Sequence, residues 1–218
     1  MNAELFWFNM NSLGSLFFFD LSTSEIKALF SSEFPWEILK KLPQFFSTVA
    51  FGIKSEIPSS VHVLEKNKIA IGKGCKFYPG SVIEGPCFIG DGVEIGPNAF
   101  IRPYSILLKE SKVGNCSEIK ESILFPKAKA PHFNYVGNSI LGNGVNLGAG
   151  VVCANYKLDK TEVKIKYQNQ VLQTGMKKLG AIIGDGSFIG CNTTLSPGTL
   201  LKKEFSCLPC SNIYGVHI

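Results

Sequence analysis

Three residues in the middle of the chain have the chemistry to bind a phosphate and to move a proton. Arg102 is the only arginine among the 22 basic residues, and its guanidinium offers a fixed fork of donors to an anion. Lys120 adds a point charge, so the two cations can hold one phosphate dianion. His132 carries an imidazole, whose unperturbed pKa lies near neutrality, so that it can accept a proton. The competing interpretations are a solvated lysine and an exposed loop histidine.

The elements that must position these residues follow a period of six. Large apolar residues recur at every sixth position without a break, at Ile71, Phe77, Ile83, Ile89, Ile95, Ile101, Leu107, Val113 and Ile119. Glycine or proline often follows, as expected at corners. The period predicts short strands joined by corners, three sides to a coil, with stacked coils pairing strand on strand. The expected fold class is all-β: a left-handed parallel β-helix of hexapeptide repeats, with three hexads per coil.

The period slips and then resumes later in the chain. The next inward candidates are Leu124, Ala130, Val136, Leu141, Leu147 and Cys153, with steps of only five at Ile119 to Leu124 and at Val136 to Leu141. A charged, polar stretch at about 157–180 interrupts the repeat, and its alternating pattern predicts a projecting hairpin. The repeat returns at Ile183, Ile189, Leu195 and Leu201. We therefore expect one solenoid domain over 57–218 with this loop as an insertion.

Residues 1–56 do not follow the repeat. A capping-box pattern at 22–25 and Pro35 ahead of helical spacing predict helices. A solenoid leaves an open strand edge at each end, so we expect residues 1–56 to form a short helical N-terminal cap over one edge. The aromatic N-terminus lacks a basic region and is broken by polar residues, which favours neither a signal peptide nor a membrane-spanning helix. A cytoplasmic protein is expected.

Composition narrows the range of partners. The net charge of +5, from 22 basic and 17 acidic groups, suits small anions better than nucleic acid, which calls for a denser basic stripe. Seven cysteines without a disulfide-rich spacing indicate a reducing compartment. Cys207 and Cys210 form a single CxxC, which supplies too few ligands to predict a zinc site.

The strings around the polar residues resemble a known family. RPY, VGNCSEIKE, KAPHFNYVGN and GVNLGAGVVCANYKLD are similar to RPG, VGNFVEMKK, KAGHLTYLGD and NVNIGAGTITCNYDG. The latter occur in the acetyltransferase (C-terminal) domain of the bifunctional N-acetylglucosamine-1-phosphate uridyltransferase/glucosamine-1-phosphate acetyltransferase family, within the hexapeptide-repeat acyltransferase superfamily. Order and spacing match throughout 95–156, less closely over 181–201, and not over the first 50 residues. KLGAIIGD and the loop before it are closer to related sugar-1-phosphate nucleotidylyltransferase/acetyltransferase proteins, some of which accept other amino-sugar phosphates.

The resemblance implies an activity and a set of site residues. It implies an acetyl-CoA-dependent N-acetyltransferase acting on an amino-sugar 1-phosphate, with glucosamine-1-phosphate the expected acceptor, for UDP-GlcNAc and cell-envelope synthesis. His132 is then the base that takes the amine proton as nitrogen attacks the thioester, and Asn155 lies beside the amine and the acetyl group. The implied substrate-binding residues are Arg102, Lys120, Tyr135, Asn146 and Tyr156. The implied acetyl-CoA contacts are Ala149, Lys178 and Cys191.

The resemblance also implies partners, and some positions depart from it. Three chains are expected to assemble as a homotrimer with each site between neighbouring solenoids, and the loop 157–180 is expected to help enclose CoA. Cys191 replaces a serine near the CoA arm, and asparagines at corners have a competing role because they tolerate left-handed backbone. Residues 1–56 contain no glycine-rich phosphate loop, so uridyl transfer is not expected and a separate nucleotidyltransferase would supply it.

Two other functions compete with acetyl transfer. One is a non-catalytic trimeric scaffold or binding module, although a scaffold has no need for the set formed by Arg102, Lys120, His132, Asn146 and Asn155. The other is a γ-type carbonic anhydrase, which needs three converging histidines. The three histidines of this chain are too dispersed for that geometry, so no metal site is expected.

Overall fold

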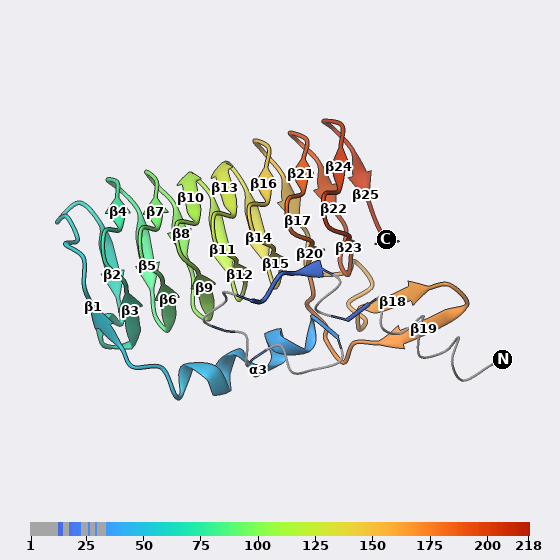
Figure 1. The fold of residues 1–218 in the computed structure, drawn as a ribbon, viewed down its shortest axis with the longest axis horizontal. Coiled ribbons are helices and arrows are strands. Elements are labelled where there is room, and N and C mark those ends of the chain that lie inside the picture. Colours follow the sequence, from blue (N-terminus) through green and yellow to red (C-terminus); the bar gives the residue numbers. More distant parts are fainter. Residues whose placement is uncertain (1–12, 15–17, 23–25, 27–28, 30–33) are drawn as a thin grey trace.

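The computed structural model describes residues 13–14, 18–22, 26, 29 and 34–218. Their short strands stack into a parallel solenoid with three sheets as its sides (Figure 1). The nine-stranded sheet contains, in order, β1 (Gly52–Ile53), β3 (Ile69–Ile71), β6 (Cys87–Ile89), β9 (Ser105–Leu107), β12 (Ile123–Leu124), β15 (Ile140–Leu141), β20 (Ile182–Ile183), β23 (Leu200–Leu201) and β26 (Val216–His217).

The other two sides have the same parallel order. The eight-stranded sheet contains β2 (His62–Leu64), β5 (Val82–Glu84), β8 (Phe100–Ile101), β11 (Glu118–Lys120), β14 (Tyr135–Gly137), β17 (Val152–Cys153), β22 (Thr194–Leu195) and β25 (Asn212–Ile213). The seven-stranded sheet contains β4 (Lys76–Phe77), β7 (Glu94–Ile95), β10 (Lys112–Asn115), β13 (Lys129–His132), β16 (Asn146–Leu147), β21 (Phe188–Ile189) and β24 (Ser206–Cys207). The predicted hexapeptide β-helix is confirmed.

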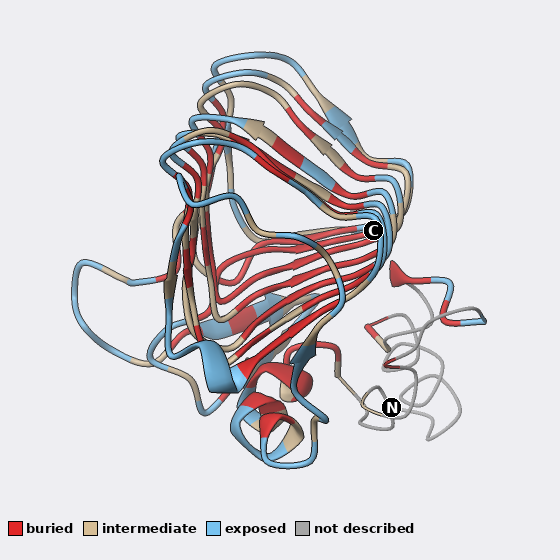
Figure 2. Ribbon diagram, turned by 90° about the vertical axis from the view of Figure 1, so that its left-hand side faces the viewer, coloured by how far each residue is buried: buried red, intermediate tan, exposed pale blue. Residues whose placement is uncertain are grey.

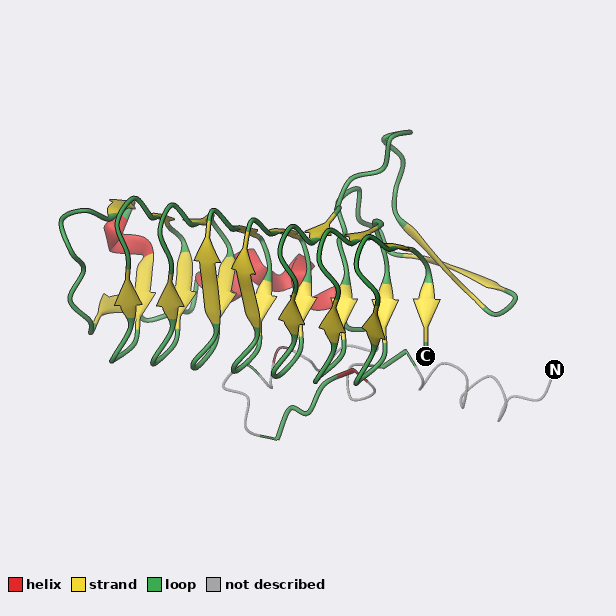
Figure 3. Cartoon of the chain, turned by 90° about the horizontal axis from the view of Figure 1, so that it is seen from above, coloured by secondary structure: helices red, strands yellow, loops and turns green. Residues whose placement is uncertain are grey.

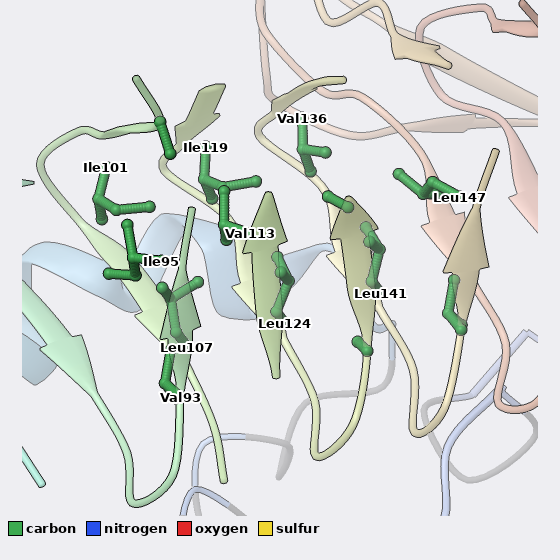
Figure 4. Close-up of a cluster of buried hydrophobic side chains, with 14 of the residues drawn as sticks. Val93, Ile95, Ile101, Leu107, Val113, Ile119, Leu124, Val136, Leu141 and Leu147 are labelled. Atoms are coloured by element: carbon green, nitrogen blue, oxygen red, sulfur yellow. The ribbon is translucent and has the colours of Figure 1, made fainter. Parts of the chain in front are cut away.

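The residues of the predicted register form the core. Every one of them, from Ile71 to Leu201, is buried in a single apolar cluster that runs along the axis of the solenoid. Seen along that axis, the buried residues line the inside of a triangular section (Figure 2). Figure 4 shows side chains from all three sheets pointing into the interior. The two short steps are also confirmed, because Ile119 pairs with Val136 and Val136 pairs with Cys153, each 17 residues on.

The nine-stranded sheet is apolar on its outer face as well. The strings SILL, SILF and SILG place Ile106, Ile123 and Ile140 outward, next to inward leucines. Helix α3 (Glu37–Phe46) begins after Pro35, as predicted, and buries its apolar side against these residues. A sheet covered on both faces reads as a continuous hydrophobic run, which is the pattern of these strings.

The expected position of the N-terminal segment is wrong in one respect. Phe18, Phe19 and α3 lie along the outer face of the nine-stranded sheet rather than over its end, and the Phe19 ring stacks on Phe125 at 5.0 Å. The apolar outer face offers more area than one strand edge, and burial follows apolar area. The capping-box pattern at 22–25 lies outside the described residues, and the division into a cap of 1–56 and a domain of 57–218 stays a prediction.

The insertion forms the predicted hairpin. Strands β18 (Lys164–Tyr167) and β19 (Gln170–Gln173) pair antiparallel around the tip at Gln168 and Asn169. The hairpin projects beyond the coils (Figures 1 and 3), while Val163 and Ile165 at its base join the apolar cluster under α3. In the part of the chain that the structure describes, no helix is long and apolar enough to cross a membrane.

Candidate functional site

The outer face of the eight-stranded sheet carries the two predicted phosphate ligands. Residues Ile101 and Ile119 are paired, so Arg102 and Lys120 follow at neighbouring positions of consecutive coils. Each cation already has a carboxylate partner. Arg102 Nη1 donates to Glu118 Oε1 at 2.8 Å, and Lys120 Nζ lies 3.4 Å from Glu121 Oε1. The Lys120 side chain is only 16% exposed, so it is held against the sheet rather than solvated.

A column of polar residues runs along the corner that joins the eight- and nine-stranded sheets. Its members Glu121, Asn138 and Asn155 are 17 residues apart and are linked by side-chain hydrogen bonds. We call this column, with Tyr104 before it, the covered corner, because the Tyr104 ring packs edge-on against Phe46 of α3. Asn138 and Asn155 are buried. The predicted site residue Asn155 is therefore part of a fixed network.

Tyr135 and Gly137 fill the space between the covered corner and the sheet. Both positions face outward, because Val136 between them points into the core. A Cβ atom at Gly137 would lie 2.6 Å from Asn155 Nδ2 and 2.7 Å from the Tyr135 hydroxyl oxygen. Tyr135 and Asn155 therefore occupy the volume above a glycine that a larger residue would take. Gly137 is a site residue that the sequence reasoning missed.

His132 lies at the opposite corner of the same sheet. Asn115 pairs with His132, the N–H of Gly150 donates to the His132 carbonyl, and the N–H of Asn192 donates to the Ala149 carbonyl. These bonds stack Asn115, His132, Ala149 and Cys191 in consecutive coils. We call this column the exposed corner, because the His132 and Cys191 side chains are open to solvent. Three predicted site residues are thus brought together there.

The exposed corner is held by one buried side chain. Asn134 is 2% exposed, its Oδ1 accepts the N–H of His132, and its Nδ2 donates to the carbonyl of Gly148. Among the described residues, the His132 ring and the Ala149 N–H have no hydrogen-bond partner. The corner therefore presents an exposed imidazole and, in the next coil, a backbone N–H without a partner among the described residues.

The structure does not bring all predicted site residues together. The side of the coil from His132 to Asn138 spans roughly 15–20 Å at about 3.3 Å per residue, so one small substrate cannot touch both corners of one chain. Asn146 lies on a different side, on the outer face of the seven-stranded sheet between Lys129 and Phe188. Apart from Tyr156 and Lys178, the predicted set thus divides into a group around Lys120, a group around His132, and Asn146.

A pocket of about 390 Å³ lies beside the covered corner. It is lined on one side by Tyr104, Glu121 and Asn138, and on the others by α3 and residues 176–178. The exposed Lys178 lines this pocket, and its backbone forms an isolated bridge with Tyr156. Two predicted ligands therefore lie at the root of the insertion, on the side of the covered corner rather than beside Cys191.

Sequence reasoning missed the residues that hold the site. Glu118, Glu121, Asn134 and Asn138 all lie inside or next to strings already singled out. Their signal was the 17-residue spacing produced by the two short steps, which places 121, 138 and 155 in one column. Their partners could not be deduced without the corner geometry, because Glu121 and Asn138 both adopt left-handed backbone at φ 46° and 45°.

The cysteines and the possible metal ligands of the described residues were also compared with the site. Burial raises the pKa of Cys87 and of Cys153 to about 12, so neither forms a thiolate near neutral pH. All seven cysteines are free. Within the described ranges, no group of three or more His, Cys, Asp or Glu residues could hold a metal ion.

Known proteins share this sequence pattern. Residues 83–177 match the family described as the GMPPB C-terminal domain. A bifunctional sugar-1-phosphate nucleotidylyltransferase/acetyltransferase of Sulfurisphaera tokodaii is 38% identical over 165 residues, which cover 75% of this chain and 41% of that protein. A bifunctional protein GlmU of Methanocaldococcus jannaschii is 37% identical over 164 residues, which cover 75% of this chain and 40% of that protein.

The chain is a hexapeptide-repeat protein that spans about two fifths of the length of the curated relatives it matches. Its resemblance to the acetyltransferase (C-terminal) domain of the bifunctional GlmU family, predicted from the motifs, is confirmed. Among solved structures, a putative acetyltransferase from Bacillus cereus is 15% identical over 72% of this chain and 80% of that chain, with a TM-score of 0.41.

Proposed function

We propose that the protein transfers an acetyl group from acetyl-CoA to the amine of an amino-sugar 1-phosphate, with glucosamine-1-phosphate as the first acceptor to test. The observation that carries the proposal is the outer face of the eight-stranded sheet. Arg102 and Lys120 lie there at neighbouring positions, with Asn155 fixed at the edge of the same face. A phosphate dianion fits the two cations, and a polar sugar fits the face beside them.

The sugar phosphate binds in competition with the two carboxylates that now neutralise the cations. Because the Arg102–Glu118 pair is about one-third exposed, its net free energy is small, and a dianion that accepts from both cations replaces it. Tyr135 supplies a hydroxyl to the sugar. Asn155, at the edge of the face, is then beside the amine at the other end of the substrate.

The exposed corner supplies the chemistry of transfer. His132 takes a proton from the ammonium group as its nitrogen attacks the thioester carbon. The new C–N bond forms and the C–S bond breaks. The ammonium nitrogen loses two protons in all, of which one goes to water and the other passes through His132 to the leaving CoA thiolate. The free N–H of Ala149 donates to the oxyanion that forms in between, and Cys191 lies next to it along the same corner for the pantetheine arm.

The separation of the two corners requires a second chain. If His132 and Asn155 act on the same amine, they come from different copies, because one chain holds them at opposite corners of a sheet. A cyclic trimer satisfies this by placing the exposed corner of each copy against the eight-stranded face of the next. The hairpin insertion, with Lys178 and Tyr156 at its root, then reaches toward the neighbour and encloses CoA, while Asn146 faces the neighbour's substrate.

The activity is tested by incubating the protein with acetyl-CoA and glucosamine-1-phosphate and following free thiol. CoA release above background is expected, and galactosamine-1-phosphate serves as the second acceptor. Glucosamine without phosphate is the control for the role of the cations and should be a poor substrate. A trimeric protein that releases no CoA with any acceptor would be a binding scaffold instead.

The shared site is tested by mixing two inactive variants. His132→Ala and Asn155→Ala chains are unfolded together, refolded and assayed. Random trimers contain intact sites at about a quarter of the positions if each site takes His132 from one chain and Asn155 from the next. Recovery to about a quarter of the unchanged rate is expected. No recovery in trimers proven to be mixed by mass spectrometry would place both residues in one chain's site.

A further inference from the structure

The covered corner contains an acidic residue, Glu121, to which the proposed reaction gives no part beyond competing with the phosphate for Lys120. Glu121 Oε2 accepts from Asn138 Nδ2 at 2.7 Å, and Asn138 Oδ1 accepts from Asn155 Nδ2 at 2.6 Å. Glu121 Oε1 faces Lys120 Nζ at 3.4 Å. The Glu121 carboxylate therefore contacts Lys120, which is expected to bind the phosphate. It also contacts Asn155, which is expected to bind the amine, through the side-chain amide of Asn138.

The chemistry of the three groups fixes the direction of this chain of hydrogen bonds. A carboxylate only accepts, so Asn138 must turn its NH₂ toward Glu121. The other end of the Asn138 amide is then an oxygen, which requires Asn155 to turn its own NH₂ toward Asn138. An amide whose two ends are nearly alike in shape is oriented by such a network and not by packing alone.

The orientation decides what Asn155 presents to the site. With Nδ2 committed to Asn138, the other end of the amide is Oδ1. No described residue donates to Asn155 Oδ1, and this atom is not among their fully buried unpaired polar atoms, so it keeps some accessible surface. Asn155 thus offers an acceptor, which suits an N–H of the attacking amine and does not suit the oxyanion of the acetyl group.

We infer that Glu121 is a positioning residue, which fixes the polarity of Asn155 through Asn138 and holds Lys120 with its second oxygen. This inference rests on the proposed function. Glu121 contacts no substrate. It links Lys120, which binds the phosphate, to Asn155, which accepts from the amine. In the unliganded chain, one carboxylate thus sets both the position of Lys120 and the polarity of Asn155, beside the pocket lined by α3 and residues 176–178.

The test is a cycle of three variants. In Asn138→Asp, the introduced carboxylate can still accept from Asn155 Nδ2, but it faces the Glu121 carboxylate, so the two repel one another and the column loses its order. Asp tolerates the left-handed backbone of this position, so folding is preserved. In Glu121→Gln, the ion pair with Lys120 and the group that sets the polarity are lost. In the double variant Glu121→Gln with Asn138→Asp, the introduced glutamine amide donates to the introduced carboxylate, which also accepts from Asn155 Nδ2, so the original polarity returns.

The expected rates follow from whether the column from Glu121 to Asn155 is ordered. Asn138→Asp lowers kcat about tenfold or more, and Glu121→Gln lowers kcat about threefold without raising KM for the sugar phosphate, because Lys120 loses a competing anion. The double variant returns kcat to within about threefold of the unchanged enzyme, a non-additive result. Asn98→Asp, at an exposed left-handed corner position, is the matched control and leaves kcat unchanged.

Two outcomes would overturn the inference: single variants with the unchanged kcat, or a double variant no faster than Asn138→Asp. A second measurement separates this from failure of the proposed function. The side-chain amide resonance of Asn155 in ¹⁵N spectra is expected to shift in Asn138→Asp and to return in the double variant. A protein that releases no CoA refutes the acetyl transfer, while an Asn155 resonance that ignores both substitutions refutes the column.

Discussion

The two corners of the eight-stranded sheet are built in opposite ways. At the covered corner, every polar side chain from Glu121 to Asn155 has a partner inside the chain, and α3 packs beside it. At the exposed corner, the His132 ring and the Ala149 N–H have no partner among the described residues. One chain therefore preorganises the groups proposed to bind substrate at the covered corner. It leaves the groups proposed to transfer the acetyl group, at the exposed corner, open to a second copy of the chain or to CoA.

Corner length explains much of the difference. The covered corner loses one residue in each of two coils, at the steps from Ile119 to Leu124 and from Val136 to Leu141. Shortening draws Glu121 and Asn138 inward and stacks them 17 residues apart, within hydrogen-bond reach. The exposed corner is not shortened in these coils, and there the side chains of His132 and Cys191 have no hydrogen-bond partner among the described residues.

The largest effect is expected at the exposed corner. His132→Ala removes the proposed base and should lower kcat by roughly 100- to 10,000-fold, the usual contribution of a general base. The thiol-release assay at saturating substrates measures it. His62→Ala, an exposed histidine of β2 far from either corner, is the control and should keep the unchanged rate. A His132→Ala enzyme with most of its activity would remove the proton-transfer role from this corner.

The free energy of unfolding should depend on the packing of α3 on the nine-stranded sheet and not on the side chains of the exposed corner. Leu42 of α3 is 1% exposed in the cluster on the nine-stranded sheet, so Leu42→Ala should lower the free energy of unfolding by about 2–5 kcal/mol. Urea denaturation measures the change. Phe133→Ala, next to His132 and 61% exposed, should alter it by less than about 0.5 kcal/mol. Equal changes in the free energy of unfolding would mean that the packing of α3 contributes no more to stability than the exposed ring of Phe133.

The sequence predicted the fold well because one signal repeats many times. A pattern of inward residues at every sixth position can be recognised even where a single position departs from it. All of the predicted inward residues from Ile71 to Leu201 are in the core. The position of α3 was predicted wrongly, although the signal was present in SILL, SILF and SILG. An outward isoleucine beside an inward leucine shows that both faces of a sheet are covered, but not which segment covers them.

The site was predictable only in part for a physical reason. A motif places His132 and Asn155 in order along the chain, but whether they meet depends on how far a coil side extends between two corners. The network around Asn155 depends on left-handed backbone at Glu121 and Asn138, and a one-residue shortening does not by itself show where their side chains point. The roles of the site residues stay predictions.

A smaller effect is expected at Gly137, on the face between the corners. Gly137→Ala puts a methyl group 2.6 Å from Asn155 Nδ2 and 2.7 Å from the Tyr135 hydroxyl oxygen, so both groups must move. We expect kcat to fall about tenfold, because displacing positioned groups is costly for the rate, with little change in the urea midpoint. Gly52→Ala, where a methyl group meets nothing within 4 Å, is the matched control. An unchanged rate would show that Asn155 and Tyr135 need no fixed position.

The smallest effect concerns the thiols of the exposed corner. Cys116 and Cys191 are exposed, whereas burial raises the pKa of Cys87 and Cys153 to about 12. Iodoacetamide at pH 8 should therefore label the first pair and leave the second pair unmodified until the chain unfolds, because the thiolate is the reactive form. Saturating CoA should slow the labelling of Cys191 by a few fold and leave Cys116 unaffected, as peptide mass spectrometry would show. Equal protection of Cys116 and Cys191 from iodoacetamide would contradict the binding of CoA beside Ala149 and Cys191. The exposed corner would then supply the base but not the binding site for the acyl donor.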